Sequence, residues 1–308
     1  MKHRIGQPGE FGHVAVLMGG TAAEREVSLT SGRAVLAALQ QRGVQATGVD
    51  VQGNLVESLL AQRFDRAFNI IHGRGGEDGV LQGTLESLRL PYTGSGVLAS
   101  ALAMDKLRTK LCWIGAGIPT PAWCALETED DLVRCAEELG FPVIVKPSAE
   151  GSSIGMSRAA TPEELRTAWE SASRFECAVF AEQWVEGLEY TAAVLDDEPL
   201  PLIRLETPNA FYDFDAKYRA NTTRYHCPAG LDAAAEARLQ HLALKACQAV
   251  GVRGWGRVDL LVDARGKPWL IEVNTVPGMT DHSLVPMAAQ AAGIPFDELV
   301  WRILETSV

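Results

Sequence analysis

Arg257, Asp259, Glu272 and Asn274 carry the polar groups of two neighbouring β-forming runs near the end of the chain. In "GRVDLLVD" the first two alternate with apolar residues, and in "PWLIEVN" the last two do the same. The short polar loop "ARGK" between the runs predicts a β-hairpin. Because alternate residues of a strand share one face, each run presents its two polar side chains on a single face.

The register of this hairpin decides whether the polar groups meet. If Asp263 opposes Pro268, then Asp259 lies opposite Glu272, whereas a shift of one residue turns Glu272 away. Two carboxylates placed opposite each other repel, unless a cation lies between them. Oxygen ligands from Asp, Glu and Asn suit Mg²⁺ or Mn²⁺. The alternative is an exposed polar sheet face on which Arg257 pairs with an acid, and the hairpin alone leaves both interpretations open.

A lysine at the end of an apolar run is the second candidate for chemistry. The run "FPVIVKP" delivers Lys146, and the small, polar loop "SAEGSSIG" follows at once. Such a loop lets backbone N–H groups approach a phosphate closely. The chain has no GxxxxGK[ST] motif, because its Gly266–Lys267 pair precedes Pro268. We therefore expect a phosphate-binding loop of another design, which favours a metal–nucleotide site at the hairpin.

The elements before this loop alternate between strand and helix. Apolar runs in "HVAVLMGG" and "FDRAFNIIHG" predict strands, and "SLTSGRAVLAALQQRG" and "GVLQGTLESLRL" predict helices. This alternation predicts a parallel sheet with crossover helices, with ligand groups at the carboxyl ends of the strands. Glycine loops at 19–28 and 72–79 lie there. A GxGxxG beginning at Gly73 fails at Asp78, so a nicotinamide oxidoreductase is only weakly supported.

The rest of the chain divides into two further units. Residues 105–186 combine helical "MDKLRTKLCWIGAGIP", "DDLVRCAEELG" and "TPEELRTAWESASR" with strands "FPVIVKP" and "CAVFAEQWVEG". Residues 187–308 hold the strand "LEYTAAVLD", a polar and aromatic stretch at 206–230, a helix at 232–250 and the hairpin. We predict three domains, at 1–104, 105–186 and 187–308.

Composition limits the possible partners and compartments. The 308 residues carry a net charge of −11, which argues against nucleic-acid binding because that needs a basic surface. The six cysteines form no CxxC, as expected for reduced thiols of a cytoplasmic protein. No apolar run reaches the about 20 residues that span a bilayer, and the run 14–18 is too short for a signal peptide. We expect a cytoplasmic protein that does not bind membranes.

Several motifs, taken together and in order, resemble the D-alanine–D-alanine ligases of the ATP-grasp superfamily. They are "GGTAAEREVSLTSG", "HGRGGEDG", "GFPVIVKPSAEGSSIGMS", "FYDFDAKY", "GWGRVDLLV" and "EVNTVPGMTDHSLVP". The resemblance covers the chain from residue 14 onward. It implies an α/β ATP-grasp fold of three domains, in which a Rossmann-like N-terminal domain precedes two α+β domains that clasp ATP. It also implies synthesis of D-alanyl-D-alanine for peptidoglycan through a D-alanyl phosphate, two Mg²⁺ ions (or Mn²⁺) and a homodimer.

The resemblance also implies which residues bind ATP. The phosphates would contact the ammonium groups of three lysines, the adenine would lie in a pocket formed partly by backbone groups, and one glutamate would hold the ribose. The residues implied are Lys106, Lys146, Ser153, Glu182, Trp184, Val185, Glu189, Phe211 and Lys217. Taken alone, "AEQWVEG" is typical of a plain strand with a core tryptophan, and a single lysine is typical of a solvated surface charge.

Substrate residues follow from the same motifs. Glu24 would bind the ammonium of the first D-alanine and His72 would position the same substrate, although both otherwise fit ordinary loop residues. Ser283 and the N–H of Leu284 would hold the carboxylate of the second D-alanine, although "DHSLVP" otherwise fits a helix cap. Arg257 and a backbone N–H near Gly278 would stabilise the oxyanion of the tetrahedral intermediate. Asp259, Glu272 and Asn274 would be the metal ligands.

A lid over the substrates is the last implied feature. Ser152, Tyr218 and Glu24 would form a hydrogen-bonded triad that ties the aromatic stretch at 206–230 over the site. We expect Tyr218 to take part in removing the proton from the attacking amine. A D-alanine–D-lactate ligase, or another ATP-grasp carboxylate–amine ligase, is the first alternative. A nucleotide-binding sensor without catalysis is the second, and the intact set of charged residues argues against it.

Overall fold

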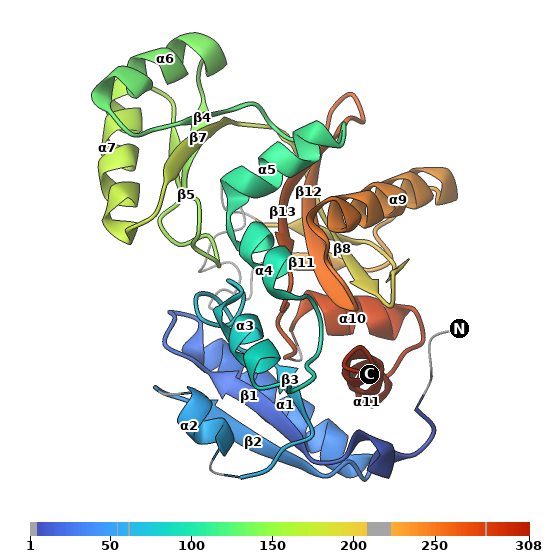
Figure 1. Cartoon of the computed structure of the whole chain (residues 1–308). Helices are drawn as coiled ribbons and strands as arrows, with labels where there is room; N and C mark the ends of the chain where they lie inside the picture. The colour runs from blue at the N-terminus through green and yellow to red at the C-terminus, as the bar shows by residue number, and fades with distance from the viewer. Residues whose placement is uncertain (1–4, 54, 61, 208–222, 281) are drawn as a thin grey trace.

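The computed structural model describes residues 5–53, 55–60, 62–207, 223–280 and 282–308. Three sheets organise these residues, and each is covered by helices (Figure 1). The predicted residues Phe211, Lys217 and Tyr218 lie outside the described ranges, so their roles stay predictions. Among the described residues, no helix has the length and apolar character needed to cross a membrane.

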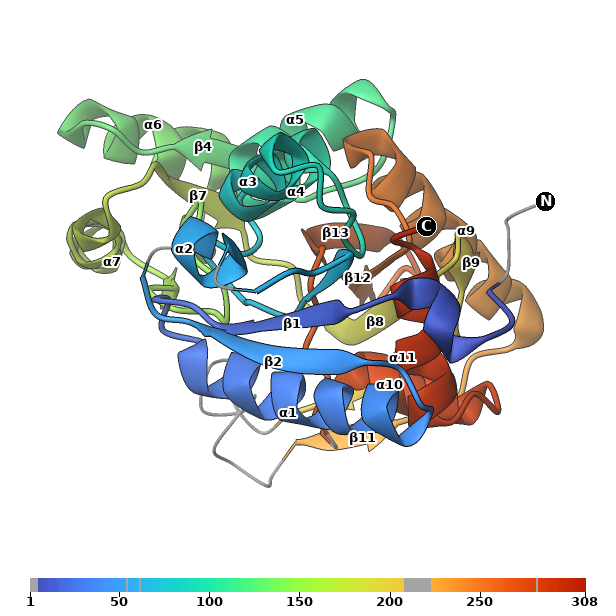
Figure 2. The same ribbon diagram turned by 60° about the horizontal axis from the view of Figure 1, so that its bottom comes forward.

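The first sheet is parallel, as the alternation of strand and helix predicts. Its order is β2-β1-β3, and β1 is buried along its whole length. In Figure 2, α1 lies along one face of this sheet, with α2 and α3 on the other side. The elements are the 3₁₀ helix η1 (Pro8–Phe11), β1 (Val14–Gly19), α1 (Arg25–Gln41), β2 (Ala46–Val51), α2 (Leu55–Leu60), β3 (Arg66–Asn69), α3 (Val80–Ser87) and α4 (Val97–Met104).

The second sheet is antiparallel, with the order β4-β7-β5-β6, and carries α6 and α7 on one face. In β5, Val143 and Val145 point into the core beneath these helices, whereas Ile144 and Lys146 take the opposite face. The elements are β4 (Trp123–Ala125), α6 (Glu129–Leu139), β5 (Val143–Pro147), β6 (Ser157–Ala159), α7 (Pro162–Ala172), the 3₁₀ helix η2 (Ser173–Phe175) and β7 (Val179–Gln183).

The third sheet has six strands in the order β11-β10-β8-β12-β13, with β9 paired to β8. One of its apolar cores includes residues of α9, and α5 packs against the same helix through Trp113, whose Nε1 donates to Ala246 O at 3.1 Å. The elements are α5 (Lys106–Gly115), β8 (Gly187–Leu195), β9 (Glu198–Pro199), β10 (Ile203–Glu206), β11 (Arg224–His226), α9 (Ala233–Val250), β12 (Trp255–Asp263), β13 (Pro268–Asn274), α10 (Leu284–Ala291) and α11 (Phe296–Glu305).

Helices from the end of the chain return to the first sheet. Side chains of α10 and α11 share one apolar core with η1, β1 and α1, and with one face of β8. In that core, the ring of Phe11 meets the ring of Trp301 edge-on, with 4.8 Å between their centroids. The predicted boundaries at 104/105 and 186/187 stay predictions, and the packing of α5 and α11 shows that the apolar cores cross them.

The hairpin of β12 and β13 corrects the predicted closure and confirms the predicted pairing. Val262, and not Asp263, opposes Pro268, so the turn was predicted one residue out of register. A β-bulge next to Asp259 then restores the register, and Asp259 opposes Glu272 as predicted. Because of this bulge the consecutive residues Ile271 and Glu272 both line the cavity described below.

Candidate active site

A cavity of about 480 Å³ lies between the second and third sheets, and its volume is in the range of small-molecule sites. All of the described ATP residues predicted from the sequence line it, together with two of the predicted metal ligands. These residues are Lys106, Lys146, Ser153, Glu182, Trp184, Val185, Glu189, Asp259 and Glu272. The structure therefore brings together side chains from segments that are up to 166 positions apart in the numbering.

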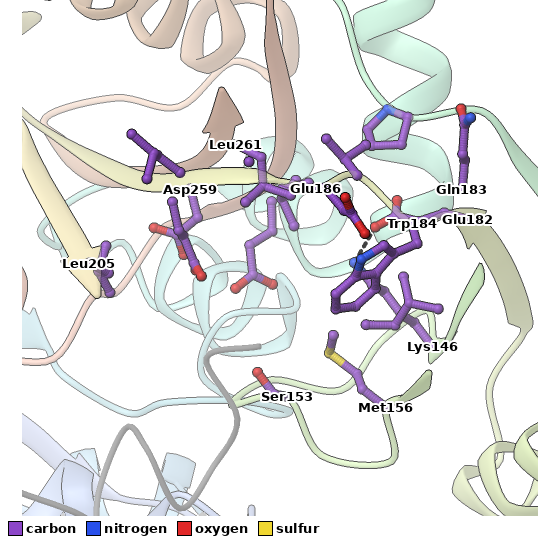
Figure 3. A pocket seen from close by; sticks show the side chains of 18 of the residues that line it. Lys146, Ser153, Met156, Glu182, Gln183, Trp184, Glu186, Leu205, Asp259 and Leu261 are labelled. Carbon is purple, nitrogen blue, oxygen red and sulfur yellow. Dashed lines mark hydrogen bonds and ion pairs between the residues drawn. The ribbon is translucent and has the colours of Figure 1, made fainter. Parts of the chain in front are cut away.

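The two sides of this cavity differ in character. In Figure 3, Trp184 and Met156 lie on one side, Asp259 and Leu205 lie on the other, and Ser153 is on the loop below them. The side of Trp184 offers an aromatic ring and a thioether to a flat ligand, whereas the side of Asp259 offers charge. The sequence did not identify Met156 and Leu205, which carry no polar signal.

Two predicted lysines are buried where they meet the cavity. Lys106 is the first residue of α5, whose N-cap Asp105 accepts a hydrogen bond from the N–H of Arg108. Nζ of Lys106 donates to Glu150 O at 2.6 Å and lies 3.4 Å from Glu272 Oε2. Lys146, which is 3% exposed, extends from β5 to the carboxylate of Glu182.

Glu182 lies between two ammonium groups. Besides its contact with Lys146, its Oε2 is 2.6 Å from Nζ of Lys110, a residue that the sequence did not identify. Burial alone would raise the pKa of Glu182, but the charges of Lys110 and Lys146 outweigh it and leave that pKa below its usual value. Glu182 is therefore ionised in this structure.

Asp259 is bonded by several neighbouring side chains at the charged end. Arg257 donates to both of its oxygens, from Nε at 2.9 Å and from Nη2 at 2.7 Å. Thr191 Oγ1 donates to Oδ1 at 2.6 Å, and Asn274 Nδ2 lies 3.3 Å from Oδ2. Three of the four predicted polar residues therefore contact one another, Thr191 joins them from β8, and Glu272 lies opposite Asp259 and lines the same cavity.

The donor set at this end fits a hard divalent cation. Asp259, Glu272 and Asn274 offer carboxylate and amide oxygens, which Mg²⁺ and Mn²⁺ prefer. Each carboxylate already has a cationic partner in the protein: Arg257 pairs with Asp259, and Lys106 pairs with Glu272. Within the described ranges, no group of three or more His, Cys, Asp and Glu residues could hold a metal by itself. Waters and phosphate oxygens would therefore have to complete the coordination.

A second cavity, of about 250 Å³, lies beside Glu24. Glu24 is 6% exposed and precedes α1, but its side chain does not cap that helix. Two glycines approach its carboxylate closely: an added Cβ would lie 2.4 Å from Oε1 at Gly151 and 2.8 Å from Oε2 at Gly73. Ser152, the predicted partner of Glu24, follows Gly151 and has a positive φ of 54°. The loop after β5 therefore reaches the residue that was predicted to bind substrate.

His72 is buried beside the loop that follows β13. Its Nδ1 lies 2.9 Å from the carbonyl oxygen of Val276, which can only accept, so Nδ1 carries the proton. Burial lowers the pKa of His72 to about 4, so the ring is neutral near pH 7. Nε2 is therefore an acceptor, and it has no hydrogen-bond partner among the described residues.

Glu77 holds the same loop from the other side, and the sequence did not identify it. Its Oε2 accepts from Gly73 N at 2.7 Å, and its Oε1 accepts from Val276 N at 3.2 Å. Burial raises the pKa of Glu77 to about 7, although the Gly73 N–H favours the ionised form. His72 and Glu77 therefore bind the C=O and the N–H of Val276, so both backbone polar groups of this residue are held.

The predicted residues for the oxyanion and for the second substrate lie together after this loop. A Cβ added to Gly278 would lie 2.8 Å from Ser283 Oγ, so the two residues are close neighbours. Ser283 occupies the N-cap position of α10, just before Leu284, but its hydroxyl does not cap the helix. It accepts instead from Thr280 N at 2.9 Å.

Comparison with known proteins finds similarity to D-alanine–D-alanine ligases, the family that the sequence motifs resemble. Family models for the C-terminal and N-terminal parts of D-Ala D-Ala ligases match residues 112–305 and 45–95. A D-alanine–D-alanine ligase of Methylococcus capsulatus is 72% identical over 307 residues, covering 100% of this chain and 99% of that protein.

Solved structures agree with the sequence match. The crystal structure of a D-alanine–D-alanine ligase from Bacillus anthracis complexed with ATP has a TM-score of 0.84 and 35% identity, covering 96% of each chain. The VanG D-Ala:D-Ser ligase from Enterococcus faecalis has a TM-score of 0.85 and 28% identity, covering 96% of this chain and 99% of that one. The chain therefore belongs to the D-alanine–D-alanine ligase family.

Proposed function

We propose that this protein joins two molecules of D-alanine into D-alanyl-D-alanine for peptidoglycan synthesis, with conversion of ATP to ADP and phosphate. The observation that carries the proposal is the register of β12 and β13. It sets Asp259 opposite Glu272 at one end of a cavity that also receives Lys106 and Lys146. The ring of Trp184 suits the base of a nucleotide, and the ammonium groups of Lys106 and Lys146 suit its phosphates. The acids Asp259 and Glu272 suit the metal ions that accompany these phosphates.

The reaction has two chemical steps. In the first, a carboxylate oxygen of one D-alanine attacks the γ-phosphorus of ATP, the bond to the β-phosphate oxygen breaks, and D-alanyl phosphate and ADP form. In the second, the amine of the other D-alanine attacks the acyl carbon and loses a proton. The C–O bond to phosphate then breaks, which leaves the dipeptide and inorganic phosphate. An acyl phosphate hydrolyses in water, so the cavity must close before the first step.

Lys106, Lys146 and the backbone of the loop at 148–155 bind the phosphates in this proposal. Buried ammonium groups stabilise the charge that moves onto ADP more strongly than solvated ones would. Asp259, Glu272 and Asn274 would hold Mg²⁺ or Mn²⁺, which would supply further positive charge to the phosphate oxygens. To hold a metal ion, Asp259 and Glu272 would have to give up contacts with Arg257 and Lys106.

Glu24 and His72 bind the first D-alanine. The carboxylate of Glu24 attracts the ammonium group of the substrate at the second cavity. His72 assists as a neutral acceptor, because its Nε2, which has no hydrogen-bond partner among the described residues, would repel an ammonium if it were protonated. Glu24 and Gly73, the residue that follows His72, both line the second cavity.

Ser283, Leu284, Gly278 and Arg257 act on the second D-alanine. The Ser283 hydroxyl and the Leu284 N–H, at the start of α10, bind its carboxylate, where a helix N-terminus favours an anion. Arg257 and the Gly278 N–H stabilise the oxyanion that forms when the amine attacks. Tyr218, tied to Ser152 and Glu24, closes the lid and takes part in the proton transfer.

The second substrate is the point at which an alternative has support. The structure of the VanG D-Ala:D-Ser ligase from Enterococcus faecalis matches this fold as well as the Bacillus anthracis protein does. The fold alone therefore does not select D-alanine over D-serine or D-lactate. Tyrosine at position 218 favours the amine of D-alanine over the hydroxyl of D-lactate.

The remaining assignments complete the proposal. We infer a homodimer that acts in the cytoplasm, without nucleic-acid or membrane partners. The net charge of −11 fits this setting, because a polyanion would be repelled. The domain boundaries are 1–104, 105–186 and 187–308, with the nucleotide between the last two.

Phosphate release tests the function directly. Protein with ATP, Mg²⁺ and D-alanine should release phosphate and form D-alanyl-D-alanine, which mass spectrometry identifies. Reactions with L-alanine, or with D-alanine plus D-lactate or D-serine, measure specificity. The Asp259→Asn variant controls for a contaminating ATPase. Phosphate release that is independent of D-alanine, or equal in that variant, would contradict the proposal.

A further inference from the structure

Lys110 is a buried lysine that the proposed reaction does not use. Its side chain is 1% exposed, and its Nζ lies 2.6 Å from Glu182 Oε2 and 2.6 Å from Thr120 Oγ1. Lys110 follows Lys106 by one turn of α5, so the two ammonium groups leave the same face of the helix. The ammonium group of Lys110 contacts Glu182 and that of Lys106 contacts Glu272, at opposite ends of the cavity.

We propose that Lys110 is a positioning residue of the nucleotide site: its ammonium holds the carboxylate of Glu182 and so leaves Lys146 available for the nucleotide phosphates. The inference rests on the proposed function, because it requires a nucleotide in the cavity. Lys110 itself does not touch the nucleotide. It acts through Glu182, which lines the cavity beside Trp184.

The charges around Glu182 explain why a second cation is needed. Glu182 is 2% exposed, and in this structure both Lys146 and Lys110 contact it. If Lys146 turns to a phosphate, Lys110 is the one cationic partner that Glu182 keeps among the described residues. Without Lys110, that movement would leave a buried carboxylate uncompensated, which proteins avoid because burial of an unpaired ion is very unfavourable. Lys146 would then remain bound to Glu182.

Thr120 connects this pair to the metal end of the cavity. Its hydroxyl accepts from Lys110 and donates to Leu270 O of β13 at 2.8 Å. Leu270 N in turn donates to Pro119 O at 2.9 Å. β13 also carries Glu272, so Lys110 holds Glu182 in a fixed position relative to the strand of the metal ligands.

Nucleotide binding by the Lys110→Met variant tests the proposal. The probe is the non-hydrolysable analogue AMP-PNP with Mg²⁺, measured by isothermal titration calorimetry. We expect about a tenfold weaker Kd and a matching rise in KM for ATP, the size of effect that loss of one charge-assisted hydrogen bond produces. With saturating ATP, kcat and the KM for D-alanine should change by less than about threefold. Lys245→Met, the same change on an exposed turn of α9, should bind like the unmodified protein.

A double variant separates positioning from general destabilisation. If Lys110 acts through Glu182, then Lys110→Met/Glu182→Gln binds AMP-PNP as well as Glu182→Gln alone, because the two effects are not additive. The role is refuted if Lys110→Met binds like the unmodified protein, or if the double variant binds more weakly than Glu182→Gln. If Lys110→Met does not fold, the comparison of Glu182→Gln with Lys110→Met/Glu182→Gln tests the role of Lys110 by itself. Failure of the unmodified protein to bind AMP-PNP would instead refute the proposed function.

Discussion

Replacing Glu77 by glutamine should change how the stability of the protein depends on pH. Glu77 holds Gly73 N and Val276 N, and its pKa is raised from 4.5 to about 7 by burial. A folded-state pKa above the unfolded one means that the folded protein binds more protons between these values. The stability contributed by this carboxyl is therefore complete below about pH 4.5 and is lost as the pH rises to about 7.

The structure sets the expected size of this effect. At about 1.4 kcal/mol per pH unit, the shift corresponds to an upper bound of about 3 kcal/mol. Glu77 is partly exposed, so solvent screens its charge, and we expect roughly half of that bound. At roughly 2 °C per kcal/mol, the Tm of the unmodified protein minus that of Glu77→Gln should fall by about 3 °C between pH 5 and pH 8.

Thermal unfolding followed by circular dichroism at pH 5, 6, 7 and 8 measures this difference. Taking the difference between two variants cancels every group that they share. Glu163→Gln, the same chemical change on the exposed first turn of α7, shows what the removal of one negative charge does by itself. A difference for Glu77→Gln that is constant, or that grows as the pH rises, would refute the assignment of a raised pKa to Glu77.

Three further substitutions test the proposed site. Thr191→Val removes the hydroxyl that donates to Asp259 Oδ1 at 2.6 Å, so Mn²⁺ affinity measured by electron paramagnetic resonance should fall about tenfold, and unchanged affinity would exclude this supporting role. Gly151→Ala would place a Cβ 2.4 Å from Glu24 Oε1, so we expect the KM for D-alanine to rise about tenfold in steady-state assays. Tyr218→Phe should keep the fold and shift the product from dipeptide towards D-alanyl-D-lactate, and unchanged dipeptide synthesis with no gain on D-lactate would exclude its role.

The hairpin shows what alternation in a sequence can and cannot predict. The alternation correctly predicted which polar residues share a face within each strand, because this follows from strand geometry alone. The turn was predicted one residue out of register. The pairing of Asp259 with Glu272 is nevertheless correct, because the bulge beside Asp259 offsets the shift at the turn. No local pattern in "GRVDLLVD" or "PWLIEVN" indicates this bulge.

The residues that the sequence did not reveal act through contacts between distant segments. Lys110 and Glu182 are far apart in the chain and meet only when α5 packs beside the second sheet. Glu77 meets Val276 across 199 positions, in a way that no spacing rule describes. The strand β2 (Ala46–Val51) was also missed, since Gly48 and Asp50 interrupt its apolar pattern. Parallel pairing with β1 compensates for this weak β-propensity.

The core that joins η1, α1 and α11 affects how the chain can be divided for experiments. A fragment that stops at residue 104 would retain α1 and the first sheet but lose Trp301 and the other apolar residues of α10 and α11. Phe11 and the outer side of α1 would then face water, and the isolated piece should aggregate instead of folding. During synthesis on the ribosome, this core of the first sheet can therefore be completed only after α10 and α11 have been made.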